Sequence, residues 1–169
     1  VEHAQHLNPN DINRFKSTGA IASMQAVHCT SDAPFVVKRL GEWRARTGAY
    51  AWKSLLDKDV VIVNGTDTPV EDIDPVANFY ASVTRSRLDN GMRFFVEQRM
   101  SREQALRSYT LDAAYGAFEE DIKGSIKPGK LADFTILDTD WLQCDDDDIP
   151  NTKVLFTIVN GEVKYALNE

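Results

Sequence analysis

Two short apolar runs, residues 21–24 and 60–63, mark the first part of the chain and predict buried strands. Between them, residues 49–58 place aromatic and leucine side chains near one face at helical spacing, with charged side chains free to stay in water. This pattern predicts an amphipathic helix. A strand, a helix and a strand in this order are typical of two parallel strands joined by a crossover. We therefore expect an α/β arrangement here.

Another helix is predicted to begin next to Ser101. The Ser101 hydroxyl can cap the first turn, and the Gln104 side chain can return a hydrogen bond in a capping box. Apolar residues then recur at helical spacing as far as Ala117. The pattern indicates one helix with a long buried stripe, whose default role is packing in the core.

The pattern then changes from helical to strand-like. Residues 127–130 have the composition of a turn, and the residues that follow alternate apolar and polar side chains. Near the end of the chain, two β-forming runs flank Asn160-Gly161, which is the strongest short-range signal of a β-hairpin in this sequence. We place a domain boundary at the change of pattern, giving domains 1–120 and 121–169.

Composition and charge narrow the possible functions. Hydrophobic residues make up 43% of the chain and charged residues 27%, which excludes a disordered or fibrous chain. A formal net charge of -7 would repel a phosphate backbone, so we expect no nucleic-acid partner. No apolar run approaches the roughly 20 residues of a membrane span, so we expect no membrane partner. Cys29 and Cys144 are too few and too far apart for a disulfide framework, which favours reduced thiols and a cytoplasmic location.

Histidine, aspartate and cysteine side chains are the candidates for chemistry. His3 and His6 could share a helix face and bind zinc, but on a strand they would point to opposite sides. Asp67 follows a predicted strand, and the carboxyl ends of strands carry the chemistry in α/β barrels; a turn former or helix cap is the alternative. Cys29 beside His28 raises the question of a nucleophile, but adjacent residues seldom reach the required geometry. We interpret Cys29 as a small buried residue.

The acidic run Asp145–Asp148 raises the question of a calcium loop. It lacks the alternating oxygen ligands and the turn glycine of such loops. A solvated surface turn is the favoured interpretation.

Taken together, several segments resemble the amidohydrolase superfamily, specifically the amidohydrolase family 3 group that includes enzymes similar to N-substituted formamide deformylase. The resemblance covers nearly the whole chain, and the order of the segments is more specific than any one of them. The segments are residues 2–5 (Glu-His-Ala-Gln), 22–25 (Ala-Ser-Met-Gln) with His28, 50–56 (Tyr-Ala-Trp-Lys-Ser-Leu-Leu), 65–70 (Gly-Thr-Asp-Thr-Pro-Val), 109–114 (Tyr-Thr-Leu-Asp-Ala-Ala) and 123–134 (Lys-Gly-Ser-Ile-Lys-Pro-Gly-Lys-Leu-Ala-Asp-Phe).

The resemblance implies a (β/α)8 barrel of the TIM type whose strand ends hold one or two divalent metal ions, commonly zinc. This chain would supply the C-terminal part of the barrel, followed by strands of a small β-sandwich domain. His3 matches a metal ligand on the sixth strand. Asp67 matches the aspartate that ends the eighth strand, which binds metal and acts as the catalytic base. Gln25 and His28, at the end of the seventh strand, would face the substrate.

The departures from the family pattern limit this expectation. The paired histidines of the first strand, the bridging residue of the fourth and the histidine of the fifth have no counterpart in this sequence. A catalytic zinc usually has three protein ligands, so we expect the isolated chain to be inactive and to hold no metal if the two matched ligands are all that it offers.

We therefore expect part of a hydrolase that cleaves a carbon–nitrogen bond of a small-molecule amide, other than a peptide bond, by metal-activated water. The alternative is a non-catalytic structural or assembly module that keeps the fold. Val1 in place of an initiating methionine predicts a truncated N-terminus. An incomplete parallel sheet would expose strand edges, so we also expect a homo-oligomer.

Overall fold

A computed structural model describes residues 1–167, and its first layer is built around two short parallel strands. Strand β1 (Ala22–Met24) pairs with β2 (Ile62–Asn64), with Ala22 opposite Ile62. Glu2 adds a third parallel segment through a bridge to Ser23. The parallel pair predicted from the sequence is confirmed, although both strands are shorter than the apolar runs or shifted along them.

The connection between β1 and β2 contains three helices rather than the single helix that was predicted. They are α2 (Ala26–Leu40), α3 (Glu42–Gly48) and α4 (Trp52–Leu56). The predicted helix at 49–58 is shortened to α4 because Tyr50 and Asp59 adopt left-handed backbone angles, with φ of 50° and 53°, which an α-helix cannot include. Before β1, a short 3-10 turn, η1 (Pro9–Asp11), leads into α1 (Ile12–Thr18).

Three further helices follow β2. They are α5 (Pro75–Thr84), α6 (Arg102–Tyr109) and α7 (Leu111–Gly116), with a 3-10 turn, η2 (Val96–Gln98), before α6. The capping box at Ser101 and Gln104 is confirmed. The prediction of one long helix is wrong, because Thr110 leaves helical geometry with φ of −122° and ψ of −91° and separates α6 from α7.

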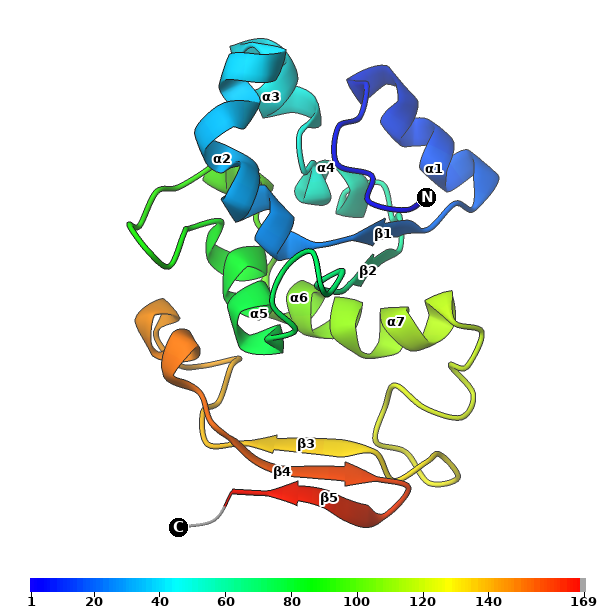
Figure 1. Cartoon of the computed structure of the whole chain (residues 1–169). Coiled ribbons are helices and arrows are strands. Elements are labelled where there is room, and N and C mark those ends of the chain that lie inside the picture. The colour runs from blue at the N-terminus through cyan, green and yellow to red at the C-terminus, as the bar shows by residue number, and fades with distance from the viewer. Residues whose placement is uncertain (168–169) are drawn as a thin grey trace.

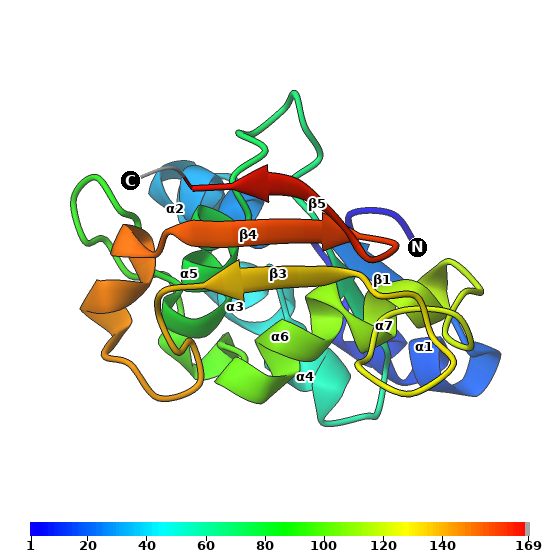
Figure 2. The same ribbon diagram turned by 90° about the horizontal axis from the view of Figure 1, so that it is seen from below.

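The end of the chain forms an antiparallel sheet in the order β3-β4-β5. Its strands are β3 (Phe134–Leu137), β4 (Val154–Val159) and β5 (Glu162–Ala166), and a 3-10 segment, η3 (Asp146–Asn151), precedes β4. The predicted hairpin at Asn160-Gly161 is confirmed. Figures 1 and 2 show this sheet as a separate layer on the side of α5, α6 and α7 away from β1 and β2. Within residues 1–167, no helix combines the length and the apolar character needed to cross a membrane.

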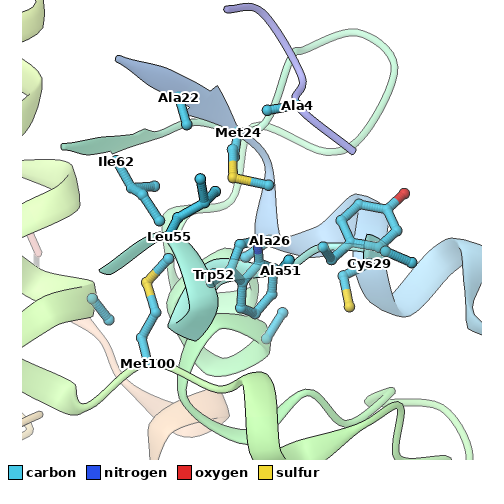
Figure 3. Packing of buried hydrophobic residues seen from close by; sticks show 14 of the residues in the cluster. Ala4, Ala22, Met24, Ala26, Cys29, Ala51, Trp52, Leu55, Ile62 and Met100 are labelled. Atoms are coloured by element: carbon cyan, nitrogen blue, oxygen red, sulfur yellow. The ribbon is translucent and has the colours of Figure 1, made fainter. Parts of the chain in front are cut away.

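The core lies between the parallel strands and the helices that connect them. Met24, Trp52, Leu55 and Ile62 are each at most 1% exposed, and their side chains converge in Figure 3. Burying such side chains contributes roughly 1.5–3 kcal/mol each. Met24 and Ile62 point to the same face of the strand pair. Their neighbours along each strand point to the opposite face, away from this packing, because successive side chains of a strand alternate.

Arg85 is an unexpected member of this core. It is 0% exposed, and its guanidinium lies 4.4 Å from the centre of the Trp52 ring. Its Nη1 donates to the Tyr50 carbonyl at 2.9 Å, and its Nε donates to the Phe94 carbonyl. Burial lowers the pKa of Arg85. A buried charge is tolerated here because carbonyl oxygens and an aromatic face replace part of its hydration.

Candidate metal centre

The carboxyl ends of the parallel segments gather polar side chains at one edge. His3 directly follows the bridging residue Glu2, Gln25 directly follows β1, and Asp67 lies three residues beyond β2. Parallel strands end on the same side of a sheet, so residues that follow them are brought together although they are far apart in the sequence. The fold therefore explains why this edge collects the candidate residues.

Three candidate ligands meet at this edge. One ligand atom each from His3, His28 and Asp67 lie within 4.8 Å of one another. His28 comes from the first turn of α2, and its ring stacks on the His3 ring with centroids 6.1 Å apart. The structure thus brings His28, as a third candidate ligand, to the pair predicted from the resemblance. Two imidazoles and a carboxylate are a donor set that suits zinc and several other divalent metals.

The burial of His28 and its lack of hydrogen-bond partners fit a metal ion at the cluster. The residue is 7% exposed, and neither ring nitrogen has a hydrogen-bond partner among the described residues. An unpartnered buried polar group costs about 1–3 kcal/mol, and most buried polar groups in proteins are satisfied. A cation at the cluster would accept a lone pair from one of these nitrogens, which gives the unpartnered ring a physical explanation.

The backbone around the cluster is strained. His3 and Asp67 have left-handed angles, with φ of 63° and 58°, and Ala4 has φ of 43°. Residues other than glycine in this region cost of order 1–3 kcal/mol each, and they concentrate at functional sites. Both candidate ligands therefore have backbone angles outside the range of a regular strand.

A hydrogen-bond network that no local pattern in the sequence indicated links the segments that carry the two histidines. Gln5 Nε2 donates to the Tyr50 hydroxyl at 2.7 Å, and that hydroxyl donates to Asp32 Oδ2 at 2.5 Å. Gln5 lies two residues after His3, and Asp32 lies one turn after His28 on α2. The network therefore ties the two histidine-bearing segments together. Burial and the Asp32 carboxylate both raise the pKa of Tyr50, so its hydroxyl remains a donor at neutral pH.

Three other candidates from the sequence lie outside the cluster, namely His6, Cys29 and the acidic run. The His6 ring packs edge-on against Tyr50, with centroids 5.6 Å apart. Burial raises the pKa of the Cys29 thiol to about 12, so it stays protonated at neutral pH and is a poor nucleophile. In the described part of the chain, the acidic run Asp145–Asp148 contributes to no cluster of three candidate metal ligands. Gln25, by contrast, does reach the site, because its Oε1 lies 3.0 Å from His3 Nδ1.

An open cavity of about 380 Å³ adjoins the cluster. Gln25 and Asp67 contribute to its lining, together with Ala113 and Gly116 of α7. The cavity places Asp67, which is exposed, beside a space that a small molecule could enter.

Replacing His28 with leucine should make the metal-free chain more stable by about 1 kcal/mol, because the change removes two unpartnered buried nitrogens while keeping a side chain of similar size. Urea denaturation of chelator-treated protein measures this difference. His6→Leu is the matched control: His6 is exposed, so the change should alter the free energy of unfolding by no more than about 0.5 kcal/mol. A loss of stability in His28→Leu would mean that the imidazole is satisfied without metal.

The strands and the cluster give this chain the features of α/β proteins whose candidate metal ligands lie at the carboxyl ends of parallel strands. The amidohydrolase family model matches residues 1–165. The chain belongs to the amidohydrolase family, which confirms the resemblance drawn from its sequence.

Similarity to individual proteins supports the assignment to this family. The chain is 39% identical over 166 residues, 98% of its length, to the protein LONG AFTER FAR-RED 3 of Arabidopsis thaliana. It is 27% identical over 125 residues, 74% of its length, to N-substituted formamide deformylase of Arthrobacter pascens. Its structure matches that of an uncharacterized metal-dependent hydrolase from Pyrococcus furiosus over 85% of the chain, with a TM-score of 0.71 and 34% identity.

The matches cover only part of each relative. The chain spans 28% of the Arabidopsis protein, 23% of the deformylase and 28% of the Pyrococcus hydrolase. Its α/β structure agrees with the fold class expected from the sequence. That it corresponds to the C-terminal part of a barrel, and that it divides at residue 120, remain predictions.

Proposed function

We propose that the chain carries part of the metal site of a hydrolase that cleaves a carbon–nitrogen bond, other than a peptide bond, in a small-molecule amide. The observation that carries this proposal is the cluster of His3, His28 and Asp67, in which His28 is buried without a partner. Membership of the amidohydrolase family supports the hydrolytic chemistry. The similarity to N-substituted formamide deformylase supports an amide of this kind as the substrate.

The residues suit distinct tasks in such a reaction. His3, His28 and Asp67 would hold a divalent metal, for which we propose zinc, through neutral imidazole nitrogens and a carboxylate oxygen. When bound, the metal would polarise the scissile carbonyl and make water a better nucleophile. The Asp67 carboxylate would take a proton from the attacking water and deliver it to the leaving amine nitrogen, as a general base and then a general acid.

The exposure of each residue fits its proposed task. Asp67 is exposed beside the open cavity, so it can meet both water and substrate. His28 is buried, which favours metal binding over the substrate contact expected for it from the resemblance. A role in polarising the carbonyl remains the alternative for this residue. Complete catalysis would require further ligands from residues outside this chain.

Zinc binding tests the proposal directly. Zinc at about 100 times its Kd should stabilise the chain by about 2.7 kcal/mol, because only the folded chain offers the assembled cluster. Asp67→Asn should weaken zinc binding at least tenfold, since even the loss of a residue that merely supports a ligand costs about 10–100-fold. Isothermal titration calorimetry and thermal denaturation with zinc provide the two measurements.

Asp121→Asn is the matched control, because it removes the same charge from another exposed aspartate. It should leave the affinity for zinc unchanged. Equal losses in both variants would indicate nonspecific attraction of a cation to an acidic chain. Failure of the unaltered chain to bind zinc would contradict the proposal and favour a non-catalytic module that keeps the fold.

A further inference from the structure

A chain of hydrogen bonds connects His3 to Gln25 and then to Glu2. His3 Nδ1 lies 3.0 Å from Gln25 Oε1, and Gln25 Nε2 lies 3.5 Å from Glu2 Oε1. The same Glu2 oxygen accepts a hydrogen bond from the Ser23 hydroxyl at 2.8 Å. Gln25 is 5% exposed at the start of α2, so burial restricts the positions that its side chain can take.

The chemistry of these groups fixes the direction of each hydrogen bond. An ionised carboxylate only accepts hydrogen bonds, so the Gln25 amide must turn its NH2 group toward Glu2. Its carbonyl oxygen then faces His3, and a carbonyl oxygen also only accepts. Nδ1 of His3 must therefore carry a proton and donate. In a neutral imidazole, this leaves the lone pair on Nε2.

We propose that Gln25 is a positioning residue, oriented by Glu2, that holds His3 in the Nδ1–H tautomer and leaves Nε2 free to bind metal. This inference rests on the proposed metal site and deepens it. It also gives Gln25 a different role from the substrate contact expected from the resemblance, because both polar atoms of its amide are already engaged. Metal-binding histidines commonly donate their second ring nitrogen to such a partner, which fixes the tautomer and the ring orientation.

The tautomer of His3 provides a test that does not require metal. Long-range ¹⁵N–¹H correlation spectra of the metal-free chain, at a pH where imidazoles are neutral, show which of the two ring nitrogens carries the proton. We expect the Nδ1–H form for His3 in the unaltered chain. Gln25→Leu removes the acceptor and should shift His3 toward the Nε2–H form, with a loss of zinc affinity of about 10–100-fold.

Two further variants separate positioning from folding. Gln25→Glu restores an acceptor at the same place and should return His3 to the Nδ1–H form. Gln143→Leu makes the same substitution at an exposed glutamine, and it should change neither the tautomer nor the zinc affinity. Glutamate also keeps the size of glutamine, so a packing effect is recognised from the stability of Gln25→Leu. A lower free energy of unfolding with an unchanged His3 tautomer would contradict the inference.

The outcomes distinguish this inference from the proposed function. An Nε2–H tautomer in the unaltered chain, or zinc binding that is lost in Asp67→Asn but unchanged in Gln25→Leu, overturns the inference and leaves the proposed function standing. A tautomer that depends on Gln25 in a chain that does not bind zinc supports the hydrogen-bond chain and contradicts the proposed function.

Discussion

Replacing Gly48 with alanine is expected to lower the free energy of unfolding by about 3 kcal/mol or more. A Cβ atom at Gly48 would lie 2.0 Å from the Leu7 carbonyl oxygen. The backbone fixes the position of a Cβ atom, and the Leu7 oxygen is itself a backbone atom, so neither can turn away. The two segments are also joined by a hydrogen bond from Leu7 N to the Gly48 carbonyl at 2.9 Å. The substitution must therefore separate the end of α3 from the segment that begins with His3.

Chemical denaturation followed by circular dichroism measures this loss. Gly65→Ala is the matched control, because a Cβ atom there meets nothing within 4 Å and the residue has no positive φ. It should change the free energy of unfolding by about 0.5 kcal/mol or less. If the two variants were equally stable, the close approach at Gly48 would be relieved by a small movement of the Leu7 segment.

Replacing Trp52 with alanine should cost about 3–5 kcal/mol of stability. The Trp52 side chain is 0% exposed in the centre of the core, so its removal leaves a large cavity. Its ring also lies against the Arg85 guanidinium, 4.4 Å from ring centre to guanidinium carbon. Without that ring, the buried charge of Arg85 would lose a favourable contact in a place that water reaches poorly.

Trp43→Ala is the control for this prediction, since Trp43 on α3 is 68% exposed. Its loss should alter the free energy of unfolding by no more than about 0.5 kcal/mol. Urea denaturation followed by circular dichroism suits both variants, because it does not depend on tryptophan fluorescence. A cost below about 1 kcal/mol for Trp52→Ala would contradict the central position of this residue in the core.

Local patterns in the sequence determined several elements of the fold. The apolar runs before Gln25 and Asn64 predicted the parallel strands, because continuous apolar segments suit strands that are covered by helices. Ser101 and Asn160-Gly161 predicted a helix start and a hairpin turn, since both depend on hydrogen bonds and backbone angles within a few residues. Asp67 became a candidate because of its place after a strand.

The sequence was less informative where the backbone departs from the local pattern. The left-handed angle of Tyr50 shortens the helix predicted around it, and Thr110 divides the helix that follows Ser101. No helix was predicted at α5, although Asp74 caps its first turn and Pro75 occupies its first position, which are recognisable signals of a helix start. That signal could have been found in the sequence.

The sequence by itself thus determined the local elements and, through its family resemblance, the candidates His3 and Asp67. Only the tertiary structure decided that His28 joins them, that the Gln25 amide contacts the His3 ring and that Arg85 is buried in the core. The physical reason is that each of these arrangements depends on contacts between residues more than 20 positions apart. Such contacts are set by the direction in which α2 leaves β1 and by the packing of the core, and no local pattern of polar and apolar residues records either.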